Sequence, residues 1–150
     1  MIRTDTEYRR ALDRLREETE TLRAQRDHLA GLDLSSTEVD RAMAPMISFH
    51  AQLEEEVDAY TRMRRGDLGP LRSLTAIGRW LVGARIARGL TQQELAERLG
   101  VDPSQVSRDE RNDYRGITVD RAQRVMDALS VRFTAEAESL LVADDEVEYA

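Results

Sequence analysis

The segment LTQQELAERLGVDPSQVSRDE, residues 90–110, decides the fold of this 150-residue chain. Its first half predicts a short helix, because Thr91 is a favourable N-cap residue and Glu94, three positions later, completes a capping box. Gly100 permits the left-handed backbone conformation that ends a helix, so a tight turn is expected there. The side chains of this helix that are expected to face a core are Leu95, Ala96 and Leu99.

The second half of the segment predicts another helix, with Asp102 as its N-cap and Pro103 at its first position, where a missing N–H costs nothing. Val106 is its expected inward anchor. The side chains left outside are small or polar, and the N-terminus of a helix favours anions. These are the properties of a recognition helix that enters the major groove of DNA. The outward residues are Ser104, Gln105, Ser107 and Arg108.

The net charge of −7 is spread unevenly along the chain. Residues 1–70 contain 11 Arg and 15 acidic residues, a net charge of −4, and residues 133–150 contain 6 acidic residues and no Arg. Residues 71–132 contain 11 Arg and 8 acidic residues, a net charge of +3. Because the local field at a contact surface decides attraction, an acidic total does not exclude DNA binding. All 22 basic residues are Arg, whose planar guanidinium suits phosphate and guanine.

The residue inventory excludes several classes of protein. There is no Cys, so the chain has neither a disulfide framework nor a thiolate metal site. His28 and His50 are too far apart in sequence to suggest a zinc site. No glycine-rich phosphate loop, nucleophile elbow or metal motif is present, so we expect neither an enzyme nor a cofactor. The polar N-terminus and the lack of an apolar run of about 20 residues indicate a cytoplasmic protein.

Residues 1–68 are expected to form a long helical hairpin that serves in dimerisation or partner binding. One helical pattern covers residues 5–30 and a second covers residues 37–65. The apolar stripe of the first is Tyr8, Leu12, Leu15, Leu22 and Leu29, and that of the second is Val39, Met43, Met46, His50, Leu53, Val57 and Tyr60.

Breaks in this pattern place the turn and the end of the hairpin. GLDLSS (31–36) separates the two helices, and Ser35 or Ser36 is the expected cap of the second. Pro45 predicts a kink in the second helix, or a helix that begins near it. MRRGDLGP (63–70) ends the hairpin with two glycines and a proline, which form a short linker.

Beyond this linker, residues 71–132 predict four or more short helices, the last of them capped by Thr118. Residues 133–150 form an acidic tail, in which ESLLV is compatible with a helical extension. The expected inward residues are Leu74, Ile77, Leu81, Ala84 and Ile86 in the first of these helices and Val119, Ala122, Val125, Met126 and Leu129 in the last.

The sequence GLTQQELAERLGVDPSQVSRDE resembles the helix-turn-helix of the XRE family, the Cro/cI-type repressors. The resemblance extends from Leu74 to Val131 and includes ARIARGLTQ upstream and ITVDRAQRVMDALSV downstream. It implies a lambda-repressor-like domain of four to five short helices that binds DNA as a homodimer on a palindromic operator. The predicted fold class is therefore all-α, with a long N-terminal hairpin followed by this domain.

The resemblance also implies roles for individual residues. Gln92 would hold a phosphate, and Arg108, on the recognition helix at residues 103–111, would contact a guanine edge. Arg85 and Glu110 match a buried structural pair that ties the first helix of the domain to the end of the recognition helix. The predicted DNA contacts are Thr91, Gln92, Ser104, Gln105, Ser107, Arg108, Arg111, Tyr114 and Arg115, with Tyr114 packed along the sugar-phosphate backbone.

Two features depart from the family pattern. Asp109 stands where the family usually has an apolar or aromatic residue, and it places a further carboxylate near the contact surface. RNDYRG (111–116) replaces the usual asparagine–glycine turn after the glutamate. Both departures concern the end of the recognition helix and leave its beginning unaffected.

The hairpin admits several functions, because its apolar stripes exceed what two helices bury alone. Its arrangement, with EYRRAL and LEEEVDAYTRMRRGD ahead of a helix-turn-helix, resembles HigA-like antitoxins, which hold a small toxin protein and repress an operon. A second hypothesis is a prophage or chromosomal bacterial repressor that the hairpin dimerises. A third is a helical adaptor whose helix-turn-helix makes only protein contacts, for which the acidic residues at 109, 110 and 113 argue.

Overall fold

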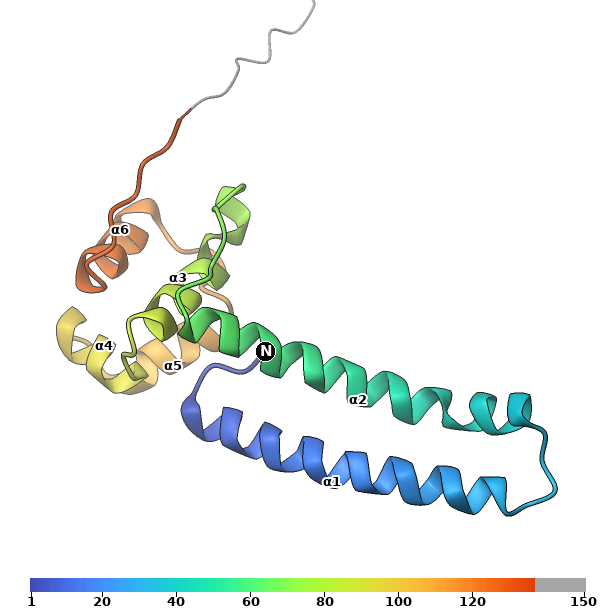
Figure 1. The fold of residues 1–150 in the computed structure, drawn as a ribbon. Coiled ribbons are helices and arrows are strands. Elements are labelled where there is room, and N and C mark those ends of the chain that lie inside the picture. The colour runs from blue at the N-terminus through green and yellow to red at the C-terminus, as the bar shows by residue number, and fades with distance from the viewer. Residues whose placement is uncertain (137–150) are drawn as a thin grey trace, which may run out of the picture.

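The computed structural model describes residues 1–136, and this part of the chain is all-α, as predicted (Figure 1). The ESLLV segment and the rest of the acidic tail beyond residue 136 lie outside the described residues. The helices are α1 Asp5–Ala30, α2 Ser36–Arg64, α3 Ile77–Ala87, α4 Gln92–Leu99, α5 Pro103–Arg111 and α6 Val119–Ala128, with a 3-10 turn, η1, at Leu74–Ala76.

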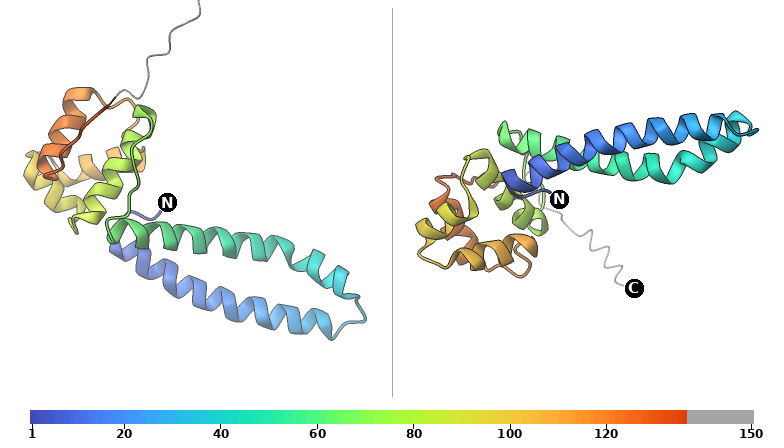
Figure 2. Two further views of the ribbon diagram at one scale, coloured as in Figure 1. Left: turned by 45° about the horizontal axis from the view of Figure 1, so that its top comes forward. Right: turned by 90° about the horizontal axis from the view of Figure 1, so that it is seen from below.

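α1 and α2 form an antiparallel hairpin that projects from the other helices (Figure 1 and Figure 2). Each helix begins with a capping box, Thr4 with Glu7 and Ser35 with Glu38, so Ser35 is the cap used of the two that the sequence allowed. The predicted apolar stripes of the two helices are buried or half-buried. The most buried members are Val39, Met43, Val57 and Tyr60.

Pro45 lies inside α2 without ending it. The helix runs from Ser36 to Arg64, so the alternative of a helix that begins near Pro45 is wrong. The first turns of α2 bend away from the remainder of the helix, in keeping with the predicted kink (Figure 1). The side chain of Pro45 is exposed, and the nearby Met43 and Met46 are buried and half-buried.

Two tyrosines close the base of the hairpin, where it meets the other helices. The rings of Tyr8 and Tyr60 stack with their centroids 4.9 Å apart. The Tyr60 hydroxyl donates to Asp5 at 3.0 Å. Burial, together with Asp5, raises the pKa of Tyr60 to about 12, so this hydroxyl remains a donor at neutral pH.

α3 to α6 pack around a core whose most buried members include Leu81, Val82, Leu95, Val106 and Leu129. The hairpin joins the same core, because Val57 and Tyr60 of α2 belong to one buried cluster with residues of α3. Two helical parts of the chain that the sequence separates by a linker are therefore packed together. Within residues 1–136, no helix combines the length and apolar content that a membrane span requires.

Two predictions of inward residues are wrong. Leu74 is 71% exposed, because residues 74–76 form the η1 turn and α3 begins only at Ile77. Val119 is 83% exposed at the first position of α6, ahead of the inward stripe that begins with Ala122. In both cases the apolar residue lies at the edge of a helix, where periodicity does not fix direction.

Candidate nucleic-acid interface

α4 and α5 form the predicted helix-turn-helix. The Thr91 hydroxyl accepts the Glu94 N–H at 3.1 Å, and the Glu94 carboxylate accepts the Thr91 N–H at 2.7 Å. Gly100 has a φ of 67° and ends α4 in the left-handed conformation. Asp102 caps α5 by accepting the Ser104 N–H at 2.8 Å, and hydrogen bonding from Ser104 holds the pKa of Asp102 below its ordinary value.

α5 turns an apolar side to the core and a polar side to solvent. Val106 is 1% exposed, and it packs in the same core as Leu95 and Ala96 of α4. Of the predicted outward residues, Ser104 and Arg108 are exposed, and Gln105 and Ser107 are half-buried. The solvent side of α5 is therefore polar and carries the guanidinium of Arg108.

A chain of polar contacts orients Arg108 on this side. Arg108 Nη2 donates to Gln105 Oε1 at 3.2 Å, and Gln105 Nε2 donates to Asp109 Oδ1 at 2.9 Å. Asp109 also pairs with Arg121 of α6. The carboxylate that departs from the family pattern therefore has a cationic partner. A guanidinium has five N–H donors, and the contact with Gln105 leaves others for a ligand.

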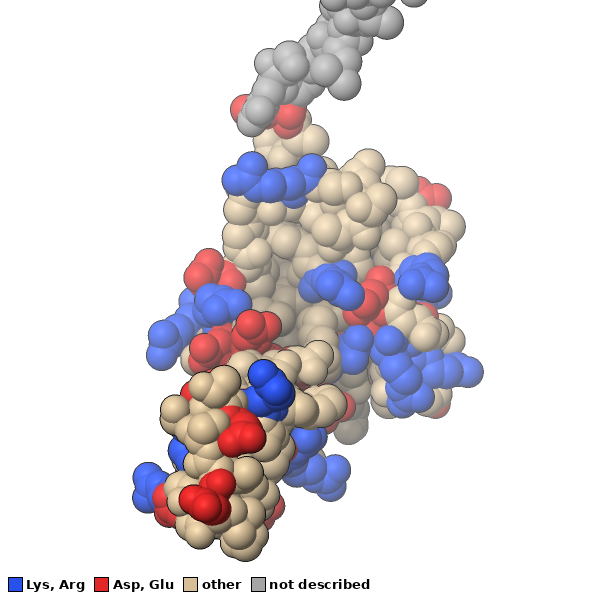
Figure 3. Space-filling view, turned by 90° about the vertical axis from the view of Figure 1, so that its right-hand side faces the viewer, with Lys and Arg blue, Asp and Glu red and all other residues tan. Residues whose placement is uncertain are grey.

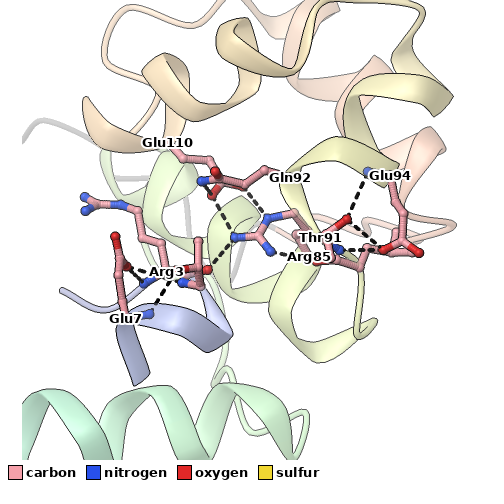
Figure 4. Close-up of polar contacts among 9 residues, drawn as sticks. Arg3, Glu7, Arg85, Thr91, Gln92, Glu94 and Glu110 are labelled. Carbon is pink, nitrogen blue, oxygen red and sulfur yellow. Dashed lines mark hydrogen bonds and ion pairs between the residues drawn. The ribbon is translucent and has the colours of Figure 1, made fainter. Parts of the chain in front are cut away.

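Arg85 and Glu110 form a buried ion pair that joins α3 to the end of α5 (Figure 4). Arg85 Nε and Nη2 donate to the two carboxylate oxygens of Glu110 at 2.5 and 2.7 Å. The exposed fractions of the two side chains are 3% and 0%. Arg85 Nη1 also donates to the backbone oxygen of Leu90 at 2.6 Å, so α3 holds the turn before α4 as well. This two-bonded geometry fixes the recognition helix against the core.

The other polar residues predicted to contact DNA lie at or near the surface. Gln92 is half-buried, and its Nε2 donates to Glu110 at 2.8 Å, so its amide also supports the buried pair (Figure 4). Thr91, Arg111 and Arg115 are exposed. For all four residues, contact with DNA stays a prediction.

The predicted contact between Tyr114 and the DNA backbone is wrong. The residue is 5% exposed, and its buried hydroxyl has no hydrogen-bond partner among the described residues. Asp113 and Tyr114 have positive φ angles of 51° and 49°, and this turn directs the ring into the core. Burial raises the pKa of Tyr114. Residues other than glycine rarely adopt this conformation, so RNDYRG did not reveal the turn.

The loop after α5 is held by arginines that the sequence analysis missed. The Asp113 carboxylate accepts from Arg3 Nη2 at 3.0 Å and from Arg79 Nε at 3.1 Å. Burial acts to raise the pKa of Asp113, but these hydrogen bonds outweigh it and the pKa is lowered. Gly78 makes room for the loop, because a Cβ there would lie 1.8 Å from the Asp113 backbone oxygen.

The first residues of the chain reach the helix-turn-helix, a second feature that the sequence analysis missed. Ile2 is buried in the shared core. The Arg3 backbone oxygen accepts from Arg85 Nη2 at 2.7 Å, so the N-terminal segment completes the surroundings of the buried pair (Figure 4). The terminal ammonium pairs with Glu56 of α2 at 3.1 Å. The only local signal for this docking was the apolar Ile2 in a polar stretch.

The fold of α4 and α5 is that of a helix-turn-helix. Residues 83–135 match the family model described as helix-turn-helix, a region that includes α4, α5 and α6. The match supports the resemblance to XRE-family helix-turn-helix proteins over that part of the chain. It does not extend to the hairpin, and nothing in the comparisons supports the resemblance to HigA-like antitoxins. The chain matches none of the curated proteins and none of the solved structures.

Proposed function

We propose that this protein is a sequence-specific transcription regulator that represses by placing α5 in the major groove of DNA. The observation that carries the proposal is the exposed polar side of α5, with Arg108 oriented by Gln105, inside a matched helix-turn-helix. The family match supports DNA binding in general. The sequence-specific contact, the repressor role and the homodimer are parts of the proposal, and so is a cytoplasmic location.

In this proposal Arg108 supplies the specificity. A guanidinium contacts the O6 and N7 acceptors of guanine through two hydrogen bonds, which discriminate against other bases by about 1–3 kcal/mol. Arg111 at the end of α5 and Arg115 in the turn after it are exposed, and both contribute phosphate contacts. Such contacts release counterions, so they make the affinity depend on salt without selecting a sequence.

A helix-turn-helix of this kind reads one half-site, so a homodimer is the form that recognises a palindromic operator. Two recognition helices related by a two-fold axis fit half-sites about 34–36 Å apart, or a multiple of this distance. A palindromic operator therefore follows from the symmetry of the proposed dimer.

The arrangement of the acidic residues on α5 and in the loop after it supports this proposal over the adaptor hypothesis. In the sequence, the carboxylates at 109, 110 and 113 favoured the adaptor hypothesis, because unpaired carboxylates repel the phosphates of DNA. In the structure, Asp109 pairs with Arg121, Glu110 with Arg85, and Asp113 with Arg3 and Arg79. Each carboxylate thus has a cationic partner, which reduces its repulsion of the DNA backbone.

Selection from a pool of randomised DNA duplexes tests the proposed function and requires no assumption about the operator sequence. The purified full-length protein is expected to enrich a two-fold symmetric sequence that contains guanine at matched positions. Enrichment of no sequence over several rounds, at low salt, would contradict DNA recognition and favour the adaptor. The antitoxin hypothesis has its own test, a small basic protein encoded beside the gene that co-purifies with the hairpin.

A further inference from the structure

The middle of α2 is the longest uncharged stretch of the hairpin. Charged residues make up 34% of the chain, yet residues 42–53, AMAPMISFHAQL, contain no Asp, Glu or Arg. Arg41 precedes this stretch and Glu54 follows it. The centres of protein–protein interfaces are depleted of charge in the same way.

Only one side of this stretch is covered by α1. Met43 is buried on the side of α2 that packs on α1, whereas the opposite side of α2 faces solvent. The two large apolar side chains that flank the solvent side are exposed, Phe49 at 67% and Ile47 at 42%. At helical spacing along this outer face lie Arg41, Ala44, Ser48, Ala51 and Glu55, all of them exposed.

Nothing in the described part of the chain covers this outer face. The remaining helices pack at the base of the hairpin, near Val57 and Tyr60, and the distal two thirds of α2 project away from them (Figure 1 and Figure 2). A groove of about 260 Å³ lies between α1 and α2 beside this face, and it is lined by Phe49, Met46, Leu22, Thr21, Arg14 and Glu18. Seen end-on from its tip, the hairpin shows uncharged areas between separate acidic and basic groups (Figure 3).

We propose that the outer face of α2 docks on the same face of a second copy of this chain. The two α2 helices lie antiparallel, with a two-fold axis beside Ser48. In this arrangement Arg41 of each copy faces Glu55 of the other, and the small residues Ala44 and Ala51 allow the helices to approach. A parallel arrangement would instead place like charges together at both ends, so the charge pattern selects the antiparallel one.

The outer face of α2 is thus the dimer surface of the proposed regulator. The spacing on DNA that follows from it rests on the proposed function. Ser48 to Tyr60 spans twelve residues of α2, about 18 Å of α-helix, so the two Tyr60 positions lie about 36 Å apart. The helix-turn-helix units attach near these positions. The dimer therefore places its two recognition helices at least about one turn of DNA apart.

Cysteine crosslinking tests the axis directly, because the chain has no cysteine of its own. Helices that pack about 8–10 Å apart bring facing Cα atoms to roughly 3.4–5.4 Å, given a Cα radius of about 2.3 Å. The upper part of this range, from about 4.4 Å, suits a disulfide. Oxidised full-length Ser48→Cys at micromolar concentration is expected to form a covalent dimer. The control, Ala24→Cys on the exposed surface of α1, keeps the α2 face and is expected to form no covalent dimer under the same conditions.

A charge exchange tests the pairing independently of disulfide chemistry. Arg41→Glu and Glu55→Arg each create two repulsive contacts per dimer, and each is expected to raise the dimer dissociation constant about tenfold. The double variant restores both contacts, and its constant is expected to return close to that of the parent in analytical ultracentrifugation. The proposed register would be overturned if the single variants left the dimer dissociation constant unchanged. It would also be overturned if the double variant dimerised as weakly as the two single effects combined predict.

Other occupants of the face, and failure of the DNA proposal, give separate results. A dimer that resists every α2 variant and dissociates with Val119→Asp would overturn the inference, because Val119 is exposed on α6. A protein that stays monomeric and uses this face for another partner would overturn it too. A crosslinked dimer that binds no DNA would support the α2 dimer surface and contradict the proposed DNA-binding function. A protein that binds DNA but forms no α2 dimer would support the DNA-binding function and overturn the α2 dimer surface.

Discussion

Glu110 shows how much a single buried carboxylate contributes to this fold. Glu110→Ala leaves the Arg85 guanidinium buried without its partner, which costs about 3–5 kcal/mol. We expect the free energy of unfolding, measured with urea, to fall by this amount. Glu97→Ala, which removes an exposed carboxylate from α4, is the matched control and is expected to change it by less than about 0.5 kcal/mol. Equal losses in the two variants would contradict the structural role of the pair.

Tyr114 gives the opposite test, because its buried hydroxyl has no partner among the described residues. Tyr114→Phe removes a polar group whose burial is uncompensated, so the free energy of unfolding is expected to rise by about 1 kcal/mol. The affinity for DNA is expected to stay unchanged, since the ring lies in the core. A variant that keeps its stability but binds DNA tenfold more weakly would restore Tyr114 to the contact surface.

At the scale of single residues, the sequence predicted two kinds of role: those set by neighbouring residues, and those implied by the family resemblance. Arg85 and Glu110 were paired through the resemblance, and the caps at Thr91 and Asp102 followed from their neighbours. The contact between Arg3 and Asp113 joins positions 110 residues apart, and no local pattern encodes it. The same holds for Arg121, whose partner Asp109 looked like an unpaired charge.

At the scale of the helices, capping carboxylates make stability depend on pH. Hydrogen bonds from Ser35, Thr91 and Ser104 lower the pKa values of Glu38, Glu94 and Asp102, respectively. A group whose pKa is lowered by folding adds stability above its unfolded value, and this contribution is lost as the pH falls. The unfolded values are 4.5 for Glu and 3.8 for Asp, so the melting temperature is expected to fall as the pH is lowered through that range.

The variant Glu94→Gln checks this assignment, since an amide cannot lose a charge in acid. Its melting temperature is expected to be lower than that of the parent at pH 7 and to change less between pH 7 and acid. Glu97→Gln, on the exposed surface of the same helix, serves as the control and is expected to keep the pH dependence of the parent. If Glu94→Gln also kept that dependence, its capping contact would be unimportant to α4.

The helices themselves followed from the sequence where local signals mark their ends. A serine cap marked the start of α2, and the Thr91–Glu94 capping box and the turn at Gly100 marked the two ends of α4, because each signal lies within four residues of the boundary that it sets. The capping box of α1 at Thr4 and Glu7 was not predicted. The η1 turn before α3 and the left-handed turn at Asp113 and Tyr114 carry no such signal. Leu74 and Tyr114 were misplaced for this reason.

At the scale of the whole molecule, the shared core predicts that the hairpin and the helix-turn-helix unfold together. Far-UV circular dichroism reports mainly on the long helices α1 and α2, and the fluorescence of Trp80, the only tryptophan, reports on α3. The two denaturation curves are expected to coincide, as in a two-state transition. A hairpin that melts at a lower denaturant concentration than Trp80 would show that the two parts are separate domains.

The packing of the hairpin on the helix-turn-helix could not be predicted from the sequence. The sequence predicted a linker between the two parts and did not show what covers the apolar stripes of the hairpin. The contact depends on Ile2, Val57 and Tyr60, which meet α3 only in three dimensions. The charge pattern was informative at this scale, because it located the net-basic region at residues 71–132. It did not show which carboxylates in that region are paired.

The most direct test of the central claim is fluorescence anisotropy on DNA from upstream of the gene, with a scrambled competitor and a salt series. The parent protein is expected to bind in the presence of the competitor and to weaken steeply as salt rises. Arg108→Ala is expected to keep its melting temperature and to lose about 1–3 kcal/mol of discrimination between the two DNAs. Absence of binding by the parent at any salt, or unchanged discrimination by Arg108→Ala, would contradict the claim that α5 reads DNA through Arg108.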